Sequence, residues 1–521
     1  MEYEKSNVIM GIFRYFYWHF NTYPDSITYV NQPQSIDGFD IVGLDLNAIF
    51  HPVCQAYYFD KKMSVKSTKT DKGCFNAICA EIESIVAITP PREELILAID
   101  GVAGLSKMHQ QRQRRFRSAK EKSDHDRAIF DSNQISTGTA WLTSLSEYIT
   151  QHFSKRRPYK VTILDQSKIG EGEHKLVRYI EPMQKKRICI YSPDADLIML
   201  GIGLNKKNIF ILRPNIYSHV KCSHFLVNID VFRKQVVSMV DPEHAYPDRE
   251  QQIVDDFVFL LYFLGNDFLP HSPSFEIKYK GIDKILSIYS SLFKEGMILV
   301  RSRPSYSINT QGFLRMVEAL AENELETIKE KHAKFRGYPN VLLDKYINTL
   351  DRSFDDYRKA YYHHHFNGVE VNDVCRDYVI GLLFVGAYYY QGMPDWLYCY
   401  PYYHGPFFRE LAQYIQRIKT EWIHVDFDAH EPLSPLVQLL CVLPPESKKW
   451  LPECVQKYYD AGSPILDLYP NDIQIDLDGV QNEYEGIVML PKMDLERVKS
   501  AFNDVKHQLT PSEIRRNTHT V

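Results

Sequence analysis

The chain of 521 residues is too long for a single hydrophobic core, so we expect two or more domains. Its 44% hydrophobic and 24% charged residues are ordinary for a globular protein, and aromatic residues are high at 13%. A formal net charge of −5 and an isoelectric point of about 6.4 exclude a generally cationic nucleic-acid-binding coat, so any phosphate-binding surface must be local.

The cysteines and the apolar segments indicate the compartment. Nine cysteines are scattered without a Cys-x-x-Cys pair, which predicts free thiols in a reducing compartment and implies no zinc site. The N-terminus lacks the basic-then-apolar pattern of a signal peptide, and the most apolar run, Val379 to Ala387, is too short to span a bilayer. We therefore expect a soluble, intracellular protein.

Five short apolar runs predict buried β-strands, and folded sequence is expected to begin near Met10. The predicted strands are Ile41–Leu44, Leu95–Ile99, Val161–Leu164, Ile188–Ile190 and Ile209–Leu212. Continuous apolar strands separated by helical patterns indicate a parallel sheet covered on both faces.

Acidic residues stand at the C-terminal ends of these strands. Asp45, Asp100 and Asp194 follow three of them, and ligands of such sheets bind beyond this edge. Asp267 closes a helix predicted from Val254 to Leu264, where a turn would aim it back toward the same edge. With the acids of two sharp turns, the complete set is Asp45, Asp100, Glu171, Glu173, Asp194, Asp196 and Asp267.

These seven acids indicate a metal site. A single acid at a strand end is more often a helix cap or a solvated turn. Several carboxylates at neighbouring turns, however, repel one another unless a cation lies between them. Mg²⁺ prefers oxygen ligands, and two such ions about 4 Å apart would clamp the attacking and leaving oxygens of a phosphodiester and activate the water. The pattern predicts a metal site that handles phosphate.

A basic stretch follows the second predicted strand. Lys107, Gln111, Arg114 and Arg115 recur at the spacing i, i+4, i+7 and i+8, which places them on one helical face. A solvated basic helix is the ordinary interpretation of such a run. Its position beside an acidic edge instead favours a pocket for a terminal phosphate.

Aromatic and histidine side chains supply further candidates. The rings of His51, Trp396 and Tyr398 would stack on any base, although core or interdomain packing explains each ring taken alone equally well. The run from His363 to His365 suggests a metal cluster, but adjacent side chains diverge, so we interpret it as surface. Cys222 and His224 also lack a partner pair for zinc.

The sequence changes character after residue 300. A charged helix, Val317 to Lys334, favours a solvated connection between domains. An apolar helix, Tyr378 to Tyr390, is followed by Pro-rich sequence with short predicted strands up to Pro491, and the polar end of the chain is expected to be mobile. The expected divisions are an extension over 1–9, a first domain over 10–300, a helical connection over 301–360, a second region over 361–500 and a polar tail over 501–521.

These motifs match a known family in content and order. From Met10 to about Glu496 the chain resembles the nuclease core of the 5′→3′ exoribonucleases of the Xrn/Rat type. In the first domain the matching motifs are Leu44-Asp45-Leu46-Asn47, Ala98 to Ala103, Lys107 to Arg117, Ser132-Asn133, Gly138-Thr139, Gly170 to Lys175, Asp194 to Gly201, Asp255-Asp256-Phe257 and Gly265 to His271. In the second region they are Tyr388-Tyr389-Tyr390, Trp396, Pro401 to Pro406 and Leu443 to Ser447. The departures are Phe13 and Ile169 where the family has Pro, and Tyr398 where it has the second Trp of Trp-x-Trp.

The resemblance implies a fold and an activity. The expected fold is α/β: a PIN-like or flap-nuclease-like parallel sheet flanked by helices, with a second mixed α+β region packed around the active site. The expected enzyme is a Mg²⁺-dependent 5′→3′ exoribonuclease that degrades 5′-monophosphorylated RNA to nucleoside 5′-monophosphates, with two metal ions and Mn²⁺ as a substitute.

The resemblance also assigns roles to residues and partners to the chain. The seven acids are the expected metal ligands and catalytic residues, and the basic face of Lys107, Gln111, Arg114 and Arg115 is the expected 5′-phosphate pocket. His51 with Trp396 or Tyr398 is the expected base-stacking pair. Single-stranded RNA is the expected partner, with decapping or RNA-decay factors beside it, no membrane, a monomeric state and cytoplasmic residence with the nucleus as an alternative. The family's long C-terminal extension has no counterpart, which suggests a compact form consisting of the nuclease core only, with a viral source as one interpretation.

Two other functions compete with this one. A flap-type nuclease that selects DNA or RNA structures uses a similar acid set, although the basic block and the second region favour the RNA substrate. A non-catalytic RNA-binding protein with the same fold is the second alternative. Seven intact acids oppose it, because a protein without catalysis has no reason to keep so many like charges together.

Overall fold

The computed structural model describes residues 14–31, 36, 38–59, 69–334 and 337–520. The predicted extension and the predicted start at Met10 lie outside these residues. A seven-stranded sheet has the order β1-β7-β6-β5-β2-β3-β4. Its strands are β1 (Ile27–Val30), β2 (Phe39–Asp45), β3 (Pro91–Ala98), β4 (Lys160–Leu164), β5 (Ile188–Tyr191), β6 (Ile209–Pro214) and β7 (His224–Asn228).

The five predicted strands are β2 to β6, and they pair in parallel, which confirms the predicted α/β class. The sheet as a whole is mixed, because β7 pairs antiparallel with β6 and β1 pairs antiparallel with β7. Neither of these two strands was predicted. In register, Asp45 faces Ala98 of β3 and Leu44 faces Tyr191 of β5, so three strands end at one level.

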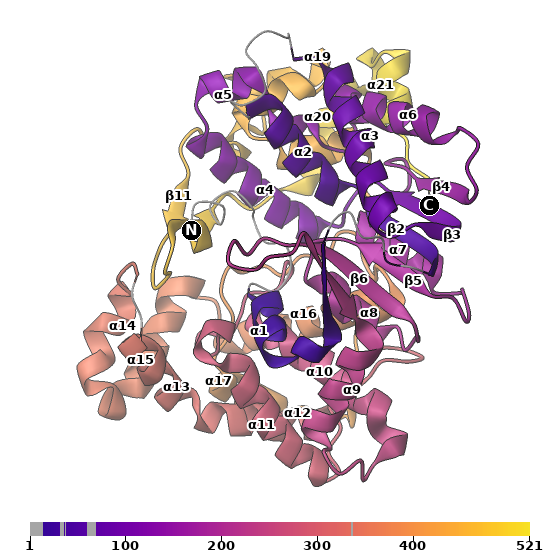
Figure 1. Cartoon of the computed structure of the whole chain (residues 1–521). Coiled ribbons are helices and arrows are strands. Elements are labelled where there is room, and N and C mark those ends of the chain that lie inside the picture. Colours follow the sequence, from indigo (N-terminus) through magenta and orange to yellow (C-terminus); the bar gives the residue numbers. More distant parts are fainter. Residues whose placement is uncertain (1–13, 32–35, 37, 60–68, 335–336, 521) are drawn as a thin grey trace.

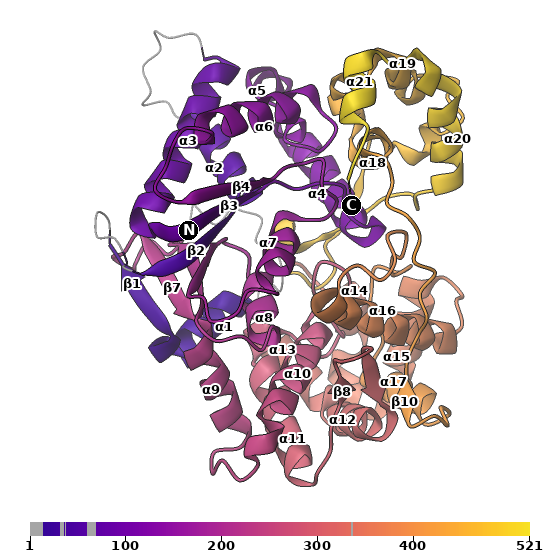
Figure 2. The same ribbon diagram turned by 90° about the vertical axis from the view of Figure 1, so that its right-hand side faces the viewer.

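Helices cover both faces of the sheet (Figures 1 and 2). Along β2, Val42 and Leu44 point into one core and Ile41 points into the other. Each of these side chains is at most 3% exposed, and burying one contributes about 1.5–3 kcal/mol. The first face is covered by α2 (Asn47–Phe59), α3 (Asp71–Ile88) and α6 (Ala140–Phe153). The second is covered by α7 (Gly172–Ile180), α8 (Asp196–Gly203), α9 (Ile229–Val240) and α10 (Glu250–Leu261), with α1 (Tyr15–Thr22) beside them.

The second core continues beyond the sheet into the rest of the chain, so residue 300 does not divide two independent cores. It reaches from Ile41 through Phe263 to Ile415. The helices that extend it are α11 (Gly281–Lys294), α12 (Thr310–Glu322), α16 (Val371–Gln391) and α17 (Phe408–Ile415). A smaller core unites α13 (Glu324–Lys334), α14 (Val341–Tyr346) and α15 (Leu350–Phe366).

The region after residue 300 is more helical than predicted. Its strands are all short: β8 (Val300–Arg301), β9 (Ser307–Asn309), β10 (Trp422–Ile423), β11 (Gln474–Asp476) and β12 (Ile487–Met489). Its remaining helices are α18 (Pro435–Val442), α19 (Glu453–Gln456), α20 (Leu495–Val505) and α21 (Pro511–Arg516). In Figures 1 and 2 these four helices, in orange and yellow, gather beside α4 (Leu105–Glu121), with which α18 and α20 share a core, and α5 (Asp124–Ile129) follows α4.

Two expectations for this region are wrong. The charged helix predicted from Val317 to Lys334 is two helices, α12 and α13, and Glu324 at the start of α13 is completely buried rather than solvated. The polar tail is also folded: Asn517 accepts a hydrogen bond of 2.9 Å from the backbone of Leu436, and Thr520 bridges to Lys168. Hydrophobic residues of α20 hold this part of the chain against α18.

The structure also bears on the predictions about cysteines and membrane-spanning segments. All nine cysteines are free thiols. In the part of the chain that the structure describes, no helix has both the length and the apolar character needed to cross a membrane.

Candidate active site

The seven predicted acids come together at the C-terminal edge of the sheet. Asp45 ends β2 and Asp100 follows β3. The backbone N–H of Gly172 donates to Asp100 Oδ1 at 2.7 Å, and α7 packs on β2 and β3 from there (Figure 2). A Cβ atom at Gly172 would lie 3.1 Å from Asp45 Oδ1 and 3.3 Å from Asp100 Oδ1. The two carboxylates therefore face the same point, and glycine leaves it open.

The loop after β5 adds two more acids by a chain of local hydrogen bonds. Ser192 donates its hydroxyl to Asp45 Oδ2 at 3.1 Å and accepts the backbone N–H of Asp194 at 3.1 Å. Asp194 Oδ1 in turn accepts the backbone N–H of Asp196 at 2.9 Å, where α8 begins. The turn thus orients Asp194 and Asp196 with its own backbone and holds Asp45 beside them.

The start of α7 and the loop after α10 complete the set. Glu171 precedes the first residue of α7 and Glu173 lies in its first turn, where a helix favours negative charge. Lys107 Nζ lies 2.5 Å from Glu171 Oε2 and 2.6 Å from Asp267 Oδ2. Gln110 donates a further hydrogen bond to Asp267. A single lysine therefore joins acids from two distant segments.

Burial and mutual repulsion make these carboxylates hard to ionise. Burial, followed by the charges of Asp100 and Asp194, raises the pKa of Asp45. Burial and the charge of Asp194 also raise the pKa of Glu173 and of Asp196. The pKa values of Glu171 and Asp194 are raised by burial as well, although Lys107 opposes this. A cation among the carboxylates would remove the cause of the repulsion.

The edge has the donor atoms that a hard cation requires. Asp45 Oδ1 and Asp194 Oδ2 are buried and accept no hydrogen bond from any residue that the structure describes. A buried carboxylate oxygen without a donor is costly. Oxygen-only ligands of this kind suit Mg²⁺ and similar ions. At the same edge Glu171, Glu173 and His174 each place one ligand atom so that all three lie within 4.8 Å of one another, so these residues could hold a metal ion, with Asp45 and Asp194 as further oxygen ligands.

The predicted basic face divides into two parts along α4. Lys107 at the start of the helix is 5% exposed. Burial acts to lower its pKa, but the charges of Asp267 and Glu171 outweigh this and hold the pKa well above its ordinary value. Lys107 therefore belongs with the acids, and it differs in this from the other predicted phosphate ligands.

The rest of that face has polar atoms without partners. Gln111 Oε1 and Arg115 Nη1 are buried and have no hydrogen-bond partner within the described ranges. Burial, followed by the charge of Arg114, lowers the pKa of Arg115 to about 10. Two neighbouring guanidinium groups that repel each other make a site for an anion such as a terminal phosphate.

The predicted stacking residues differ in how they are held. His51 lies in α2 with an exposed side chain. Desolvation by the surrounding protein, and then the charges of Arg114 and Arg115, lower its pKa, so the ring lies near the same basic groups. The ring of Tyr398 packs inside the protein, because it stacks on Phe384 with centroids 4.4 Å apart. Trp396 is half-buried, and its carbonyl accepts the backbone N–H of Leu105 at 2.8 Å, which fixes it at the start of α4.

Family models match almost all of this chain. The model described as the XRN 5'-3' exonuclease N-terminus matches residues 10–215, and the model described as the Xrn1 helical domain matches 248–346 and 351–521. The chain belongs to the XRN family. This confirms the resemblance seen in the sequence motifs.

Curated relatives agree with this assignment. The chain is 29% identical to the 5'-3' exoribonuclease 1 of Homo sapiens over 98% of its own length and 35% of the relative. It is 27% identical to the 5'-3' exoribonuclease 2 homolog of Drosophila melanogaster, covering 98% and 72%, and 24% identical to the 5'-3' exoribonuclease 1 of Saccharomyces cerevisiae, covering 98% and 44%. The chain therefore spans about a third of the human relative. Nothing in these matches supports a viral source.

Several residues of this XRN site were not assigned a role from the sequence. Tyr388 donates its hydroxyl to Glu171 Oε1 at 2.9 Å and stacks on His174 with centroids 3.9 Å apart. Burial, followed by the charge of Asp196, raises the pKa of the neighbouring Tyr389. The only signal in the sequence is three consecutive tyrosines at the end of an apolar helix, where the polar hydroxyls need partners.

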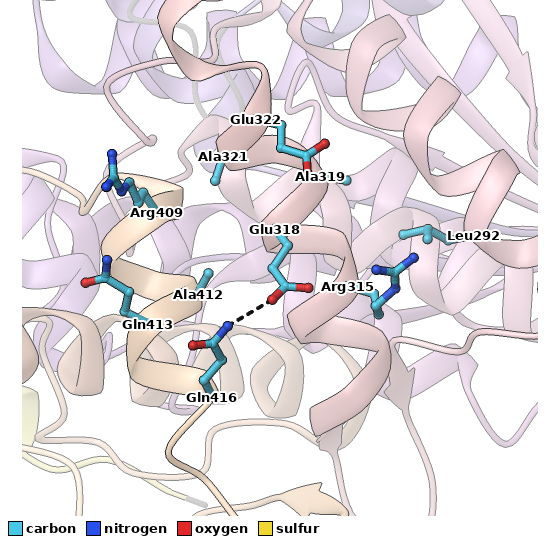
Figure 3. A pocket seen from close by; sticks show the side chains of 10 residues that line it. All are labelled: Leu292, Arg315, Glu318, Ala319, Ala321, Glu322, Arg409, Ala412, Gln413 and Gln416. Carbon is cyan, nitrogen blue, oxygen red and sulfur yellow. Dashed lines mark hydrogen bonds between the residues drawn. The ribbon is translucent and has the colours of Figure 1, made fainter. Parts of the chain in front are cut away.

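A separate hollow on this XRN protein is unrelated to the acids. It lies between α12 and α17 beside α11, and Figure 3 shows the side chains that line it. Gln416 donates to Glu318 at 3.0 Å across it, and Arg315 and Arg409 add positive charge. None of the seven acids lines this hollow.

Proposed function

We propose that this XRN-family chain is a Mg²⁺-dependent 5′→3′ exoribonuclease that acts on RNA with a 5′-monophosphate and releases nucleoside 5′-monophosphates. One observation carries the proposal. The acid edge, with its unpartnered Asp45 Oδ1 and Asp194 Oδ2, adjoins the helix face that holds the unpartnered donor Arg115 Nη1. A cation site next to an anion site is what hydrolysis of a phosphodiester near a charged RNA end requires.

The basic face would select the end of the RNA. The 5′-phosphate lies against Gln111, Arg114 and Arg115, whose donors match phosphate oxygens. We expect this pocket to take a single phosphate and to reject a cap or a triphosphate. The relatives are named 5'-3' exoribonucleases, which supports the same polarity.

The aromatic residues would hold the first nucleotide. His51 offers a ring near the basic pocket, and Trp396 offers a second ring at the start of α4. Stacking on both faces of a base is independent of sequence and stabilises binding by about 1–3 kcal/mol per base. Trp396 is the better partner for His51, because the ring of Tyr398 already stacks on Phe384.

The acid edge would carry the hydrolysis. When bound, Mg²⁺ would supply positive charge that activates a water molecule and stabilises the negative charge that develops at the phosphate and the leaving oxygen. The residues that would hold the ions are the seven acids of this edge: Asp45, Asp100, Glu171, Glu173, Asp194, Asp196 and Asp267. Lys107 holds Glu171 and Asp267 in place and adds a positive charge next to the scissile phosphate. Tyr388 and Ser192 keep the carboxylates in the required orientation.

A panel of matched RNAs tests this function. The purified chain is given one RNA with a 5′-monophosphate, a 5′-triphosphate or a 5′-hydroxyl, together with its DNA twin, with and without Mg²⁺. The expected result is Mg²⁺-dependent release of nucleoside 5′-monophosphates from the first RNA only. Equal degradation of the triphosphate RNA would refute the phosphate pocket. Binding of RNA without turnover at any Mg²⁺ concentration would show a non-catalytic RNA-binding protein, and preference for the DNA twin would show a flap-type nuclease.

A further inference from the structure

A second group of potential metal ligands lies away from the acid edge. His365, His404 and Asp476 each place one ligand atom so that all three atoms lie within 4.8 Å of one another. They come from the end of α15, from the aromatic segment after α16 and from β11. The sequence interpretation treated His365 as surface together with its neighbours, because adjacent side chains diverge. Folding separates His365, which is half-buried, from His363 and His364, which are exposed.

The three side chains are arranged like a ligand set. The imidazole rings of His365 and His404 have centroids 3.9 Å apart and an angle of 42° between their planes. His404 Nε2 lies 3.6 Å from Asp476 Oδ2, beyond ordinary hydrogen-bond length. The other oxygen, Asp476 Oδ1, accepts the backbone N–H of Asp478 at 2.9 Å, which directs Oδ2 toward His404. Carboxylates oriented in this way by a hydrogen bond are typical of metal sites.

The surrounding structure holds the ligands in place before any ion binds. Tyr361 packs against the His365 ring at 4.6 Å and donates its hydroxyl to the carbonyl of Gly405 at 2.8 Å, next to His404. The turn after β11 is fixed to the start of α14, because Asp478 Oδ1 accepts the backbone N–H of Val341 at 2.6 Å. The ligands thus come from three segments that are already attached to one another.

An ion pair between His404 and Asp476 explains two of the three residues. It does not explain why a ring nitrogen of His365 also lies within 4.8 Å of the other two ligand atoms, whereas a divalent ion uses all three.

We propose that His365, His404 and Asp476 bind one Zn²⁺ ion, with water in the fourth position. Two imidazoles and one carboxylate are borderline ligands that favour Zn²⁺ over Mg²⁺, which prefers oxygen alone. The ion fastens β11 to α15. The hairpin of β11 and β12 also holds α4, since Gln113 donates to the carbonyl of Val488 at 3.1 Å and Arg117 to those of Tyr484 and Gly486. The zinc site therefore ties the helical region to the helix that carries Arg114 and Arg115 (Figure 1).

A comparable group, Asp395, Asp428 and His430, does not support a second site. His430 Nδ1 lies 3.0 Å from Asp395 Oδ1 in a direct ion pair, and Asp428 and His430 are exposed. The direct pair leaves no space for an ion between these two groups. The cluster with His365 lacks such a close pair.

Zinc binding by the purified full-length chain tests the proposal. The protein is first stripped with a chelator and then kept in excess Mg²⁺, so that the acid edge is occupied by the hard ion. The expected result is one Zn²⁺ per chain by elemental analysis, a rise in Tm on adding Zn²⁺ that Mg²⁺ does not reproduce, and visible d–d absorption when Co²⁺ replaces Zn²⁺. A wild-type Tm that does not respond to Zn²⁺ would overturn the site, whatever the behaviour of any variant.

Matched variants locate the ion. His365→Ala and His404→Ala are expected to weaken Zn²⁺ binding by at least about 100-fold, because even partners outside the ligand set cost 10–100-fold. His363→Ala, two residues away and exposed, is expected to bind like wild type. Undiminished binding by His365→Ala, or an equal loss in His363→Ala, would reject this ligand set. These measurements need no RNA and no turnover, so their result is independent of the proposed exoribonuclease activity.

Discussion

Two groups of buried acids in this protein look alike in burial and differ in their hydrogen-bond partners. Asp256 in α10 and Glu324 in α13 are 0% exposed, and Asp45 and Asp194 at the sheet edge are 2% and 1% exposed. Asp256 accepts hydrogen bonds at both oxygens, from Tyr289 at 2.8 Å and from the backbone of Val300 at 2.9 Å. At the sheet edge, one oxygen of Asp45 and one of Asp194 accept none from any described residue.

The difference separates structural acids from candidate ligands. A buried carboxylate whose donors come from the protein links the segments that supply those donors. One that lacks a donor lowers stability unless something outside the chain supplies positive charge. Burial and sequence motif alone do not make this distinction, since Asp256 also lies within a motif shared with the XRN family. Substitutions in the two groups should therefore have opposite effects on activity and stability.

The largest expected effect is on activity at the sheet edge. Asp194→Asn keeps Oδ1 as an acceptor for the backbone of Asp196 but removes a charged ligand atom. We expect turnover of 5′-monophosphorylated RNA to fall by at least about 10³-fold, beyond the 10–100-fold typical of residues that only support ligands. In chelator, the free energy of unfolding should stay the same or rise, because one repelling charge is lost. Unfolding in urea and single-turnover assays measure both.

The matched change in the other group is Asp256→Asn. It should lower the free energy of unfolding by about 1–3 kcal/mol, since an amide group replaces an acceptor of several donors. Activity per folded molecule should remain. The opposite result would be loss of stability in chelator for Asp194→Asn and loss of turnover for Asp256→Asn. It would show that Asp194 is structural and that the proposed active site is wrong.

The next largest effect is expected in the basic pocket beside the edge. Replacing both Arg114 and Arg115 with Gln removes the two guanidinium groups proposed to bind the 5′-phosphate. Hydrogen bonds to charged groups contribute about 1.5–3 kcal/mol, so kcat/KM for 5′-monophosphorylated RNA should fall by about 10²-fold. An RNA with a 5′-hydroxyl should be affected much less, and a comparison of the two substrates measures the effect.

Lys120→Gln is the control for that experiment. Lys120 is exposed on the same helix and pairs with Asp472 at 3.2 Å, away from the pocket. Exposed pairs of this kind contribute about 0–1 kcal/mol, so neither substrate should be affected. An equal loss for both RNAs in the arginine variant would assign Arg114 and Arg115 to general RNA binding.

Runs of consecutive apolar residues, each followed by an acid, were sufficient to predict the parallel strands and the edge at which the acids lie. Strands β2 to β6 are continuous apolar runs, and a parallel sheet aligns the ends of its strands whatever the loops do. The antiparallel strands β1 and β7 were missed, and β1 has the burial pattern of a half-exposed strand at one edge of the sheet. Helix α18 was missed because the Pro-rich sequence up to Pro491 was interpreted as short strands, whereas Pro435 begins a helix.

Contacts between distant segments could not be predicted in the same way. Helical spacing places Lys107 on the face of Gln111 and Arg115, but only the fold shows that it lies between Glu171 and Asp267. Glu324 belongs to a charged stretch, and its burial depends on packing against Phe408. In each case the partner is far away in the chain, and spacing within one helix contains no information about it.

A smaller effect is expected from Glu324, which tests the structural group without touching the site. Its carboxylate accepts hydrogen bonds from Ser274 at 2.8 Å, from the backbone of Phe408 at 2.7 Å and from that of Arg409 at 3.2 Å. Glu324→Ala leaves these donors without an acceptor and should lower the free energy of unfolding by about 1–3 kcal/mol. Glu322→Ala, two residues away and exposed, should change it by less than about 0.5 kcal/mol. Equal effects would show that Glu324 has no structural role.

A pH dependence of stability is expected from the same residue. Burial raises the pKa of Glu324 to about 8, only partly offset by its hydrogen bonds from Phe408 and Ser274, and the charge of Glu410 raises it further. The folded state therefore binds the proton more tightly than the unfolded state. This contribution to stability is complete below the unfolded pKa of about 4.3 and is lost as the pH rises through about 8, at no more than about 1.4 kcal/mol per pH unit. Glu324→Gln has no proton to lose, so wild type should lose stability relative to it between pH 5 and about 8 in urea unfolding series. The opposite result would be a wild-type free energy of unfolding that rises with pH relative to that of Glu324→Gln. It would mean that the hydrogen-bond donors around Glu324 outweigh its burial and hold the carboxylate as an anion.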